Sequence, residues 1–267
     1  MFPVLLRLGP VTLHTYGFMM ALGVACGLWF LYVQGSKHGL EAGRLVDMAF
    51  YTILISLLGA KLVLFVGDFS RYTRNPGELL SLARSGGVFQ GGLAAGIVFA
   101  LWYMYRHKMP TWRTADLIVP ALALGHGFGR LGCFSAGCCY GRACETALGV
   151  TFHNETAHGL TGLPLASSLH PVQLYEALLN FLNFGILFYL LRRKKFDGQV
   201  FAFYIINYSL IRYFTEFYRG DHDPDRLYLI HSASPYLSIS YPQLFCIIGL
   251  VVGVMMFFIL KKRKKSA

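Results

Sequence analysis

The stretch that decides the fold is QLFCIIGLVVGVMMFFIL, residues 243–260, which is followed at once by the basic run KKRKK, residues 261–265. An apolar run of about 20 residues is long enough to cross the hydrocarbon core of a bilayer as an α-helix. Six further runs of this kind lie near residues 17–35, 46–67, 87–105, 115–135, 176–191 and 199–218. The sequence therefore predicts an all-α integral membrane protein with seven transmembrane helices.

The composition supports this prediction. Hydrophobic residues make up 55% of the chain and charged residues 14%, against roughly 25% charged residues in an ordinary soluble protein. We expect one polytopic membrane domain over residues 1–267, with an interfacial segment at 1–16 in place of a cleavable signal peptide. Residues 136–175 form the longest connection, and we expect them to build a periplasmic cap between the fourth and fifth helices and to carry function.

The net charge of +11 has a pattern that favours membrane topology over nucleic-acid binding. Most basic residues fall in alternate connections and in the tail at 261–267: Lys37 and Arg44; Arg106, Lys108 and Arg113; Arg192 to Lys195; Lys261 to Lys265. Basic residues collect on the cytoplasmic side of membrane proteins. The pattern predicts a cytoplasmic C-terminus, an N-terminus outside, and a tail that contacts anionic lipid.

Two arginines lie inside predicted membrane helices. Arg130 stands in GHGFGRLGCFSAGCCYGR, residues 125–142, and Arg212 stands in NYSLIRYFTEFYRGD, residues 207–221. A charge in such a helix costs about 2.5–3.5 kcal/mol on insertion scales and usually marks a functional site. Two arginines suggest an anion, and the commonest anion in a membrane is a lipid phosphate. The alternatives are a structural Arg–Glu pair between helices and, for the glycines, close helix packing.

Five ordered motifs are spread over nearly the whole chain: His14–Gly17, Gly86–Leu93, Gly129–Arg142, His170–Glu176 and Tyr208–Arg219. Together they resemble the motifs of the bacterial prolipoprotein diacylglyceryl transferases. The resemblance implies an enzyme of the bacterial inner membrane that moves the diacylglyceryl group of phosphatidylglycerol onto the lipobox cysteine thiol of a prolipoprotein. The products would be a thioether and glycerol 1-phosphate, and no cofactor or metal is implied.

The residues suit that chemistry. Arg130 and Arg212 are the predicted phosphate ligands, because a guanidinium binds phosphate oxygens bidentately and stays charged when desolvated. Glu216 lies one turn from Arg212 and can hold it in place. The other predicted substrate contacts are hydroxyl donors, glycines that allow close approach, and motif residues: Tyr16, Tyr208, Gly91, Gly92, Gly141, Arg219, Cys133 and Cys138.

Gln90 departs from the family pattern, because many members carry histidine there. Glutamine neither gains nor loses a proton at neutral pH, so it can orient a substrate but cannot act as a general base. His126, four residues before Arg130, lies on the same helical face and is the alternative candidate for the base. Two other readings stay open: a core histidine at 126, or an acceptor thiol that the two arginines deprotonate without a protein base.

The second departure concerns cysteine. Cys133, Cys138 and Cys139 stand where many family members have Asn, Glu and an apolar residue, and Cys144 follows closely. Structural packing or a disulfide is the favoured interpretation on an oxidising outer face, ahead of a catalytic thiol. A metal site ranks last, since the spacing matches no standard zinc pattern.

Two other classes of function compete with the transferase. A membrane thiol oxidoreductase would use the crowded cysteines but would not need the two arginines. A lipid-binding or transport protein, or a paralogue acting on another phospholipid or thiol acceptor, would keep the arginines and change the cysteine positions. Alkylation or replacement of Cys133, Cys138 and Cys139 separates the oxidoreductase from the transferase.

Overall fold

A computed structural model describes residues 2–9, 11–78, 82, 87–221, 228–230 and 239–266. It is mostly helical and divides into two compact units. Unit 1 comprises residues 1–27 and 115–267, and unit 2 comprises residues 28–114. Gly86, the first residue of the second family motif, lies outside the described residues.

Each of the seven apolar runs lies in a helix, apart from residues 87–88 and 217–218, which flank two of them. The helices are α1 (Thr15–Lys37), α2 (Ala42–Gly67), α5 (Phe89–Arg106), α6 (Thr111–Ala136), α8 (Val172–Arg193), α9 (Gln199–Glu216) and α11 (Tyr241–Ser266). Five of them, α1, α2, α6, α8 and α11, are long and apolar enough to cross a membrane. The chain is thus a multi-pass helical membrane protein.

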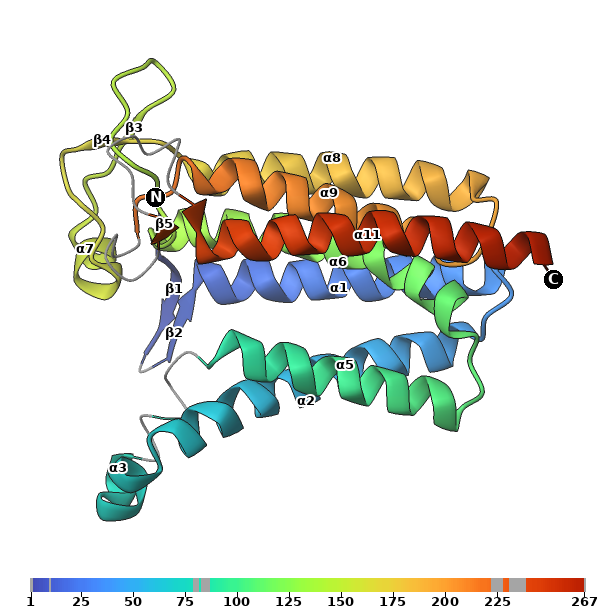
Figure 1. The fold of residues 1–267 in the computed structure, drawn as a ribbon. Coiled ribbons are helices and arrows are strands. Elements are labelled where there is room, and N and C mark those ends of the chain that lie inside the picture. Colours follow the sequence, from blue (N-terminus) through green and yellow to red (C-terminus); the bar gives the residue numbers. More distant parts are fainter. Residues whose placement is uncertain are drawn as a thin grey trace. The chain divides into compact units, whose positions relative to one another are not determined.

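Small residues bring the helices of unit 1 together. A side chain at Gly127 of α6 would meet the ring of Phe181 of α8, and one at Gly249 of α11 would meet the Ser209 hydroxyl of α9. Because lipid tails are as apolar as leucine, membrane helices gain most from close packing of this kind. The helices α8, α9 and α11 run side by side in Figure 1.

Asp116, near the beginning of α6, fixes the connection between α8 and α9. Its fully buried carboxylate pairs with Lys194 at 2.8 Å and accepts the backbone N–H groups of Gly198 and Phe201 at 2.8 and 2.9 Å. Gly198 has a φ of 89°, which other residues rarely adopt. This carboxylate satisfies N–H groups at the beginning of α9 that have no partner within the helix.

Unit 2 is built on the contact between α2 and α5. Between these two helices the chain forms α3 (Phe69–Arg74) and the short 3-10 helix η1 (Pro76–Glu78). Gly59 of α2 and Gly91 of α5 face one another, since a side chain at either would meet the backbone oxygen of the other at 2.9 or 2.8 Å. The two helices therefore approach more closely than side chains would allow.

The N-terminal segment is a β-hairpin. β1 (Val4–Leu8) pairs antiparallel with β2 (Val11–His14), and α1 begins at the next residue. The prediction of an interfacial segment at 1–16 did not include strands, because Pro3, Gly9 and Pro10 interrupt the apolar pattern. In the hairpin Gly9 supplies the turn with a φ of 59°.

Residues 136–175 are structured rather than an open loop. They contain β3 (Val150–Thr151), α7 (Glu155–Thr161) and β4 (Ser168–Leu169), with β3 paired to β4. Phe152, Ala157, Leu163 and Leu169 form a small hydrophobic core of their own. This segment lies at the end of the bundle where α8 begins (Figure 1).

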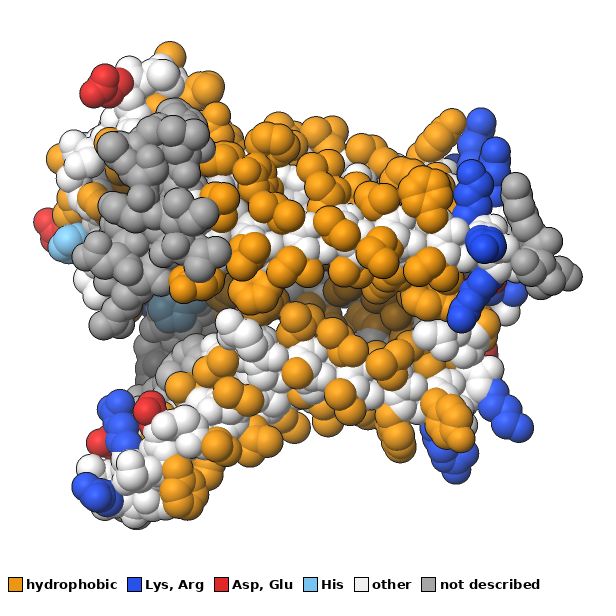
Figure 2. All heavy atoms as spheres, in the orientation of Figure 1, with side chains coloured by type: hydrophobic (Ala, Val, Ile, Leu, Met, Phe, Trp, Pro, Cys, Tyr) orange, Lys and Arg blue, Asp and Glu red, His pale blue; other side chains and the backbone are white. Residues whose placement is uncertain are grey.

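Basic side chains gather at the other end of the unit 1 bundle, where α8 and α11 end (Figure 2). Arg192 and Arg193 close α8, and Lys261, Lys262 and Arg263 are exposed on α11. Hydrophobic side chains cover the lateral surfaces of these helices, including Leu182, Ile186, Val251 and Met255. A belt of apolar surface bounded by basic residues is the arrangement expected of helices that end at a membrane surface.

Candidate functional site

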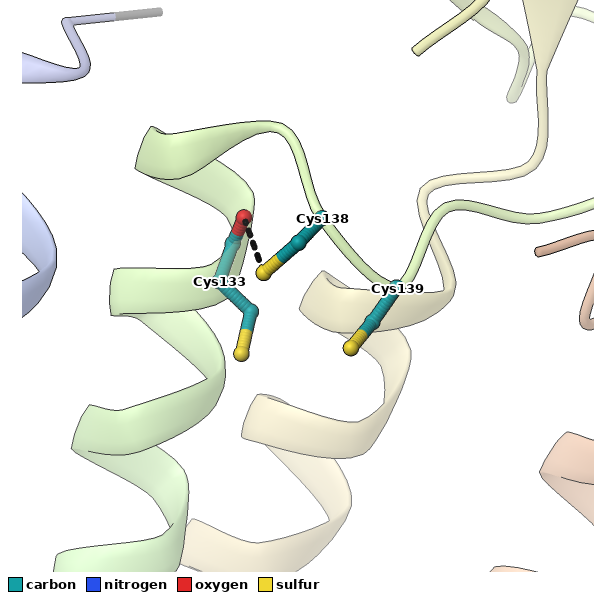
Figure 3. A group of neighbouring side chains, drawn as sticks. All are labelled: Cys133, Cys138 and Cys139. Atoms are coloured by element: carbon teal, nitrogen blue, oxygen red, sulfur yellow. Dashed lines mark hydrogen bonds between the residues drawn. The ribbon is translucent and has the colours of Figure 1, made fainter. Parts of the chain in front are cut away.

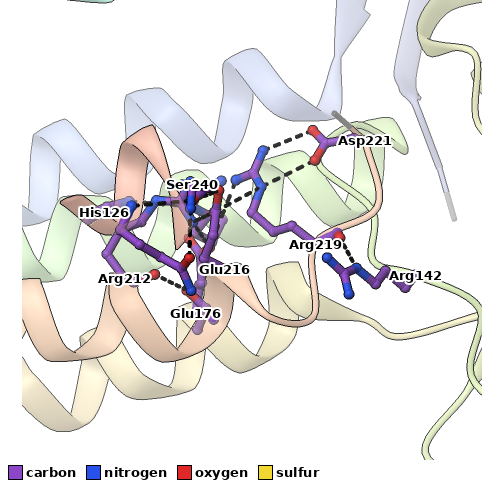
Figure 4. Close-up of polar contacts among 11 residues, drawn as sticks. His126, Arg142, Glu176, Arg212, Glu216, Arg219, Asp221 and Ser240 are labelled. Carbon is purple, nitrogen blue, oxygen red and sulfur yellow. Dashed lines mark hydrogen bonds and ion pairs between the residues drawn. The ribbon is translucent and has the colours of Figure 1, made fainter. Parts of the chain in front are cut away.

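A cluster of arginines and carboxylates lies inside unit 1 at the end nearest residues 136–175 (Figure 4). We call it the arginine–carboxylate cluster; it comprises Arg130 of α6, Glu176 of α8, Arg212 and Glu216 of α9, and Arg142, Arg219 and Asp221 from connecting segments. The cluster thus contains four arginines and three carboxylates. The formal net charge of the cluster is therefore +1.

Glu176 is the central carboxylate of this cluster. One of its oxygens lies 2.6 Å from Nε of Arg130, and the other lies 3.7 Å from Arg212 and 3.9 Å from Arg219. Its side chain is only 2% exposed. A carboxylate buried to this degree needs counter-charges, and Glu176 obtains them from two neighbouring helices and the residues after α9.

Glu216 holds Arg212 from within α9. The ion pair spans one helical turn at 2.7 Å, and the other carboxylate oxygen of Glu216 accepts a hydrogen bond from Ser240 at 3.3 Å. Ser240 belongs to β6 (Ile239–Ser240), which pairs with β5 (Tyr228–Ile230) and directly precedes α11. Ser240 therefore helps to hold the carboxylate that pairs with Arg212, and the contact joins α9 to the beginning of α11.

Arg219 forms the outer part of the cluster. Asp221 accepts two hydrogen bonds from its guanidinium at 3.2 and 2.9 Å, and the carbonyl of Arg219 accepts one from Nε of Arg142 at 3.0 Å. A fork-to-fork pair of this kind fixes the plane of the guanidinium as well as its position.

The arginine side chains of the cluster are more exposed than the glutamate side chains. Arg130 and Arg212 each retain 15% side-chain exposure, whereas Glu176 and Glu216 retain 2% and 4%. An anion can therefore reach the two guanidinium groups while the carboxylates stay buried against them. This arrangement is what an anion site needs: fixed donors with some accessible surface and no side-chain reorganisation on binding.

His126 and two tyrosines lie beside Arg130. Nε of Arg130 donates to Nε2 of His126 at 3.3 Å, and the His126 ring lies 5.5 Å from that of Tyr208. Tyr16 lies at the beginning of α1 and packs against Gly132, where an added side chain would meet its ring at 3.2 Å. His126, Tyr16 and Tyr208, three of the predicted site residues, therefore lie on or beside the part of α6 that carries Arg130.

Two close backbone contacts hold the segment after α6 in place. Gly141 donates its N–H to the carbonyl of His170 at 3.1 Å, and an added side chain there would meet that carbonyl at 2.4 Å. A side chain at Gly220 would likewise meet the carbonyl of Gly141 at 2.6 Å. These glycines let residues 138–142 lie between the beginning of α8 and the end of α9, next to the cluster.

Three cysteines come together at this point. Cys133 is on the last turns of α6, Cys138 and Cys139 follow it, and the three Sγ atoms lie within 4.8 Å of one another (Figure 3). All six cysteines of the chain are free thiols in the structure. Hydrogen bonds from the thiols of Cys133 and Cys138 hold the pKa of the Cys139 thiol well below its ordinary value, and the charges of Arg219 and Arg130 act in the same direction.

Three predicted site residues lie in unit 2. Gln90 is exposed in the first turn of α5, and Gly91 and Gly92 face α2, where side chains would meet Gly59 and Ser56. This contact is a packing reason for the two glycines. Their predicted contact with a lipid headgroup stays a prediction.

Three residues of the site, Glu176, Arg142 and Asp221, were not predicted from the sequence. Glu176 was quoted only as the last residue of a motif, although it is one of 13 acidic residues in the chain and stands at the beginning of a predicted membrane helix. An acid at that depth is a signal of the same kind as Arg130. Arg142 and Asp221 carry no such signal, because they stand in connecting segments.

Comparison with known proteins gives one family and many relatives. The model of the prolipoprotein diacylglyceryl transferase family matches residues 3–259. A phosphatidylglycerol–prolipoprotein diacylglyceryl transferase of Clostridium tetani is 34% identical over 266 residues, covering 98% of this chain and 99% of its own length. The second such enzyme of Clostridium perfringens is 29% identical, with 95% and 94% covered. That of Bacillus velezensis is 29% identical, with 82% and 81% covered.

Proposed function

The chain belongs to the prolipoprotein diacylglyceryl transferase family, and we propose that its arginine–carboxylate cluster carries out the family's reaction. The enzyme transfers the diacylglyceryl group of phosphatidylglycerol to a prolipoprotein. In the proposed reaction the acceptor is the lipobox cysteine of the signal peptide. Its sulfur forms a thioether and glycerol 1-phosphate leaves.

The phosphate of phosphatidylglycerol binds to Arg130 and Arg212. The observation that carries this proposal is their shared geometry: two guanidinium groups from α6 and α9, each 15% exposed and each paired at 2.6 or 2.7 Å to a nearly buried carboxylate. The carboxylates hold the forks in place, and the excess positive charge of the cluster is the charge that a phosphodiester would neutralise. The hydroxyls of Tyr16 and Tyr208 are donors for the phosphate or glycerol oxygens.

The thiolate of the acceptor then attacks the glyceryl carbon. A new S–C bond forms as the C–O bond to the phosphate breaks, and the electron pair of that bond stays on the phosphate oxygen. Negative charge grows on the leaving phosphate, so guanidinium groups already in place stabilise the transition state more than the ground state. Glu216 and Glu176 act as positioning residues for the two arginines.

His126 has a positioning role in this scheme. Its Nε2 lone pair accepts a hydrogen bond from Arg130 at 3.3 Å, so it cannot take a thiol proton without breaking that contact. We expect His126→Gln, which keeps an acceptor for Arg130 but cannot titrate, to retain most of the transferase rate. His126→Ala should lose about 10-fold or more.

The rate of each His126 variant is measured at saturating phosphatidylglycerol, with Tyr204→Phe as a control on the same aromatic neighbourhood. If His126→Gln is as slow as His126→Ala while both stay folded, His126 is a general base and the positioning role is wrong.

The topology is proposed from the apolar helices and the basic residues at their ends. We propose seven membrane-spanning helices, with the shorter α5 and α9 included, and a location in the bacterial inner membrane with the N-terminus outside. The basic residues at the ends of α8 and α11 support a cytoplasmic C-terminus. Residues 136–175 would then form a periplasmic cap over the cluster, in one polytopic domain.

The proposed function is tested with purified protein in detergent micelles, phosphatidylglycerol and a lipobox peptide. We expect release of glycerol phosphate only when the peptide carries cysteine, and no release when the cysteine is replaced by serine. Release without peptide would indicate a lipase. Binding of phosphatidylglycerol without release would favour a lipid-binding protein or a paralogue with another acceptor.

A further inference from the structure

The three cysteines beside the cluster have the geometry of a metal-binding group. Their Sγ atoms converge within 4.8 Å of one another, although only two of the three residues are adjacent in the sequence. A tetrahedral zinc site with Zn–S bonds of about 2.3 Å holds its sulfurs roughly 3.8 Å apart. Small rotations of the three side chains therefore bring all three sulfurs to bonding distance from one ion.

The backbone is shaped to gather these thiols. Gly137 has a φ of 82°, and Cys139 has a φ of 59°, a left-handed conformation that a residue with a side chain rarely adopts. Gln173 of α8 donates to the carbonyl of Cys138 at 2.8 Å, which ties this turn to the helix that carries Glu176. Strained backbone that the surroundings hold in place is characteristic of functional sites.

The donor set selects the class of ligand. Thiolates are soft donors that favour Zn²⁺ and Cu⁺ over Mg²⁺ or Ca²⁺. Three thiolates also need nearby positive charge, and the guanidinium groups of Arg130 and Arg219 lie in the adjoining arginine–carboxylate cluster. A disulfide would use only two of the three sulfurs, whereas a metal ion uses all of them.

We propose that Cys133, Cys138 and Cys139 bind a thiophilic metal ion, Zn²⁺ in the first instance, and leave a fourth position for the acceptor thiol. The first half of this proposal stands on the geometry, and the second half rests on the proposed transferase function. Among the described residues, no His, Asp or Glu joins the three cysteines as a possible fourth ligand. Three protein ligands with one open position are the pattern of catalytic rather than structural zinc sites.

The metal would supply a means of deprotonating the acceptor thiol. A thiol that coordinates zinc loses its proton to water and remains a nucleophilic thiolate. That sulfur then forms the S–C bond while the C–O bond breaks and its electron pair stays on the phosphate. The thioether product is neutral and a weaker ligand, so it leaves the metal.

Metal content and cobalt spectroscopy test the site without reference to activity. The full-length protein is purified in detergent under a phosphine reductant, as wild type and as Cys133→Ser, Cys139→Ser and Cys26→Ser. Cys26 lies on α1 outside the group and is the matched control. We expect about one Zn²⁺ per chain in wild type and Cys26→Ser, and at least a 10-fold lower content in the other two. The melting temperature of each protein is measured to establish whether all four are folded.

Cobalt then reports the fourth position. In Co²⁺-loaded wild type we expect a sulfur-to-cobalt charge-transfer band, and we expect the visible bands to change on addition of a lipobox peptide with cysteine but not with serine. Metal content below a tenth of an ion per chain in reduced wild type supplied with Zn²⁺ would overturn the site. So would retention of zinc by Cys133→Ser, or a disulfide that persists under reductant.

Failure of the inference and failure of the proposed function give different results. If chelated, metal-free protein still transfers the diacylglyceryl group at the full rate, the metal role is wrong and the transferase stands. If the metal binds and responds to the peptide but no glycerol phosphate is released, the site stands and the proposed reaction is wrong.

Discussion

Replacement of Arg130 by alanine should lower the rate of diacylglyceryl transfer by about 100-fold or more. Removing one fixed donor from a site that stabilises developing negative charge typically costs a factor of 100 to 1,000. Arg130 is held by Glu176 at 2.6 Å and by His126 at 3.3 Å, so its fork is positioned before the lipid arrives. Arg130→Lys keeps the charge but loses the fork, and we expect an intermediate rate.

The measurement is glycerol phosphate release per folded molecule, at several concentrations of phosphatidylglycerol. Arg193→Ala is the matched control, because Arg193 closes α8 with its guanidinium over the Tyr189 ring, roughly 25 Å along the helix from Glu176. A folded Arg130→Ala protein with the rate of Arg193→Ala would remove Arg130 from the phosphate site.

Replacement of Glu176 by alanine should destabilise unit 1 by about 3–5 kcal/mol, the usual cost of leaving a buried charge without its partner. Glu176 is 2% exposed and is the nearest carboxylate to Arg130, with Arg212 and Arg219 at 3.7 and 3.9 Å. Its loss removes the negative charge shared by α6, α9 and the segment after α9. Reversible unfolding in mixed detergent micelles gives the free energy.

The exposed Glu145 supplies the control, since Glu145→Ala removes the same charge from the segment between α6 and α8. The double variant Arg130→Ala with Glu176→Ala should recover part of the lost stability, because neither charge is then left alone. A loss of stability equal to that of Glu145→Ala would mean that water, rather than Glu176, satisfies the arginines.

The sequence was sufficient to place the helices. Each of the seven apolar runs corresponds to a helix, because burial of backbone polar groups in lipid leaves few alternatives for a long apolar segment. The N-terminal hairpin was not predicted, since two short strands broken by Gly9 and Pro10 carry little periodic signal. The small core around Phe152 and Leu163 was missed because its four residues, spaced five or six positions apart, follow neither a helical nor a strand period.

The sequence by itself determined that the chain is a helical membrane protein. It also determined that two arginines stand inside membrane helices, where a charge usually marks a functional site. It did so because hydropathy, charge placement and motif order are local properties. Only the tertiary structure decided which groups meet: Glu176 against Arg130, Arg142 beside Arg219, and Cys133 with Cys138 and Cys139. Those contacts depend on how α6, α8 and α9 pack and on left-handed residues such as Cys139, and neither can be read from spacing along one chain.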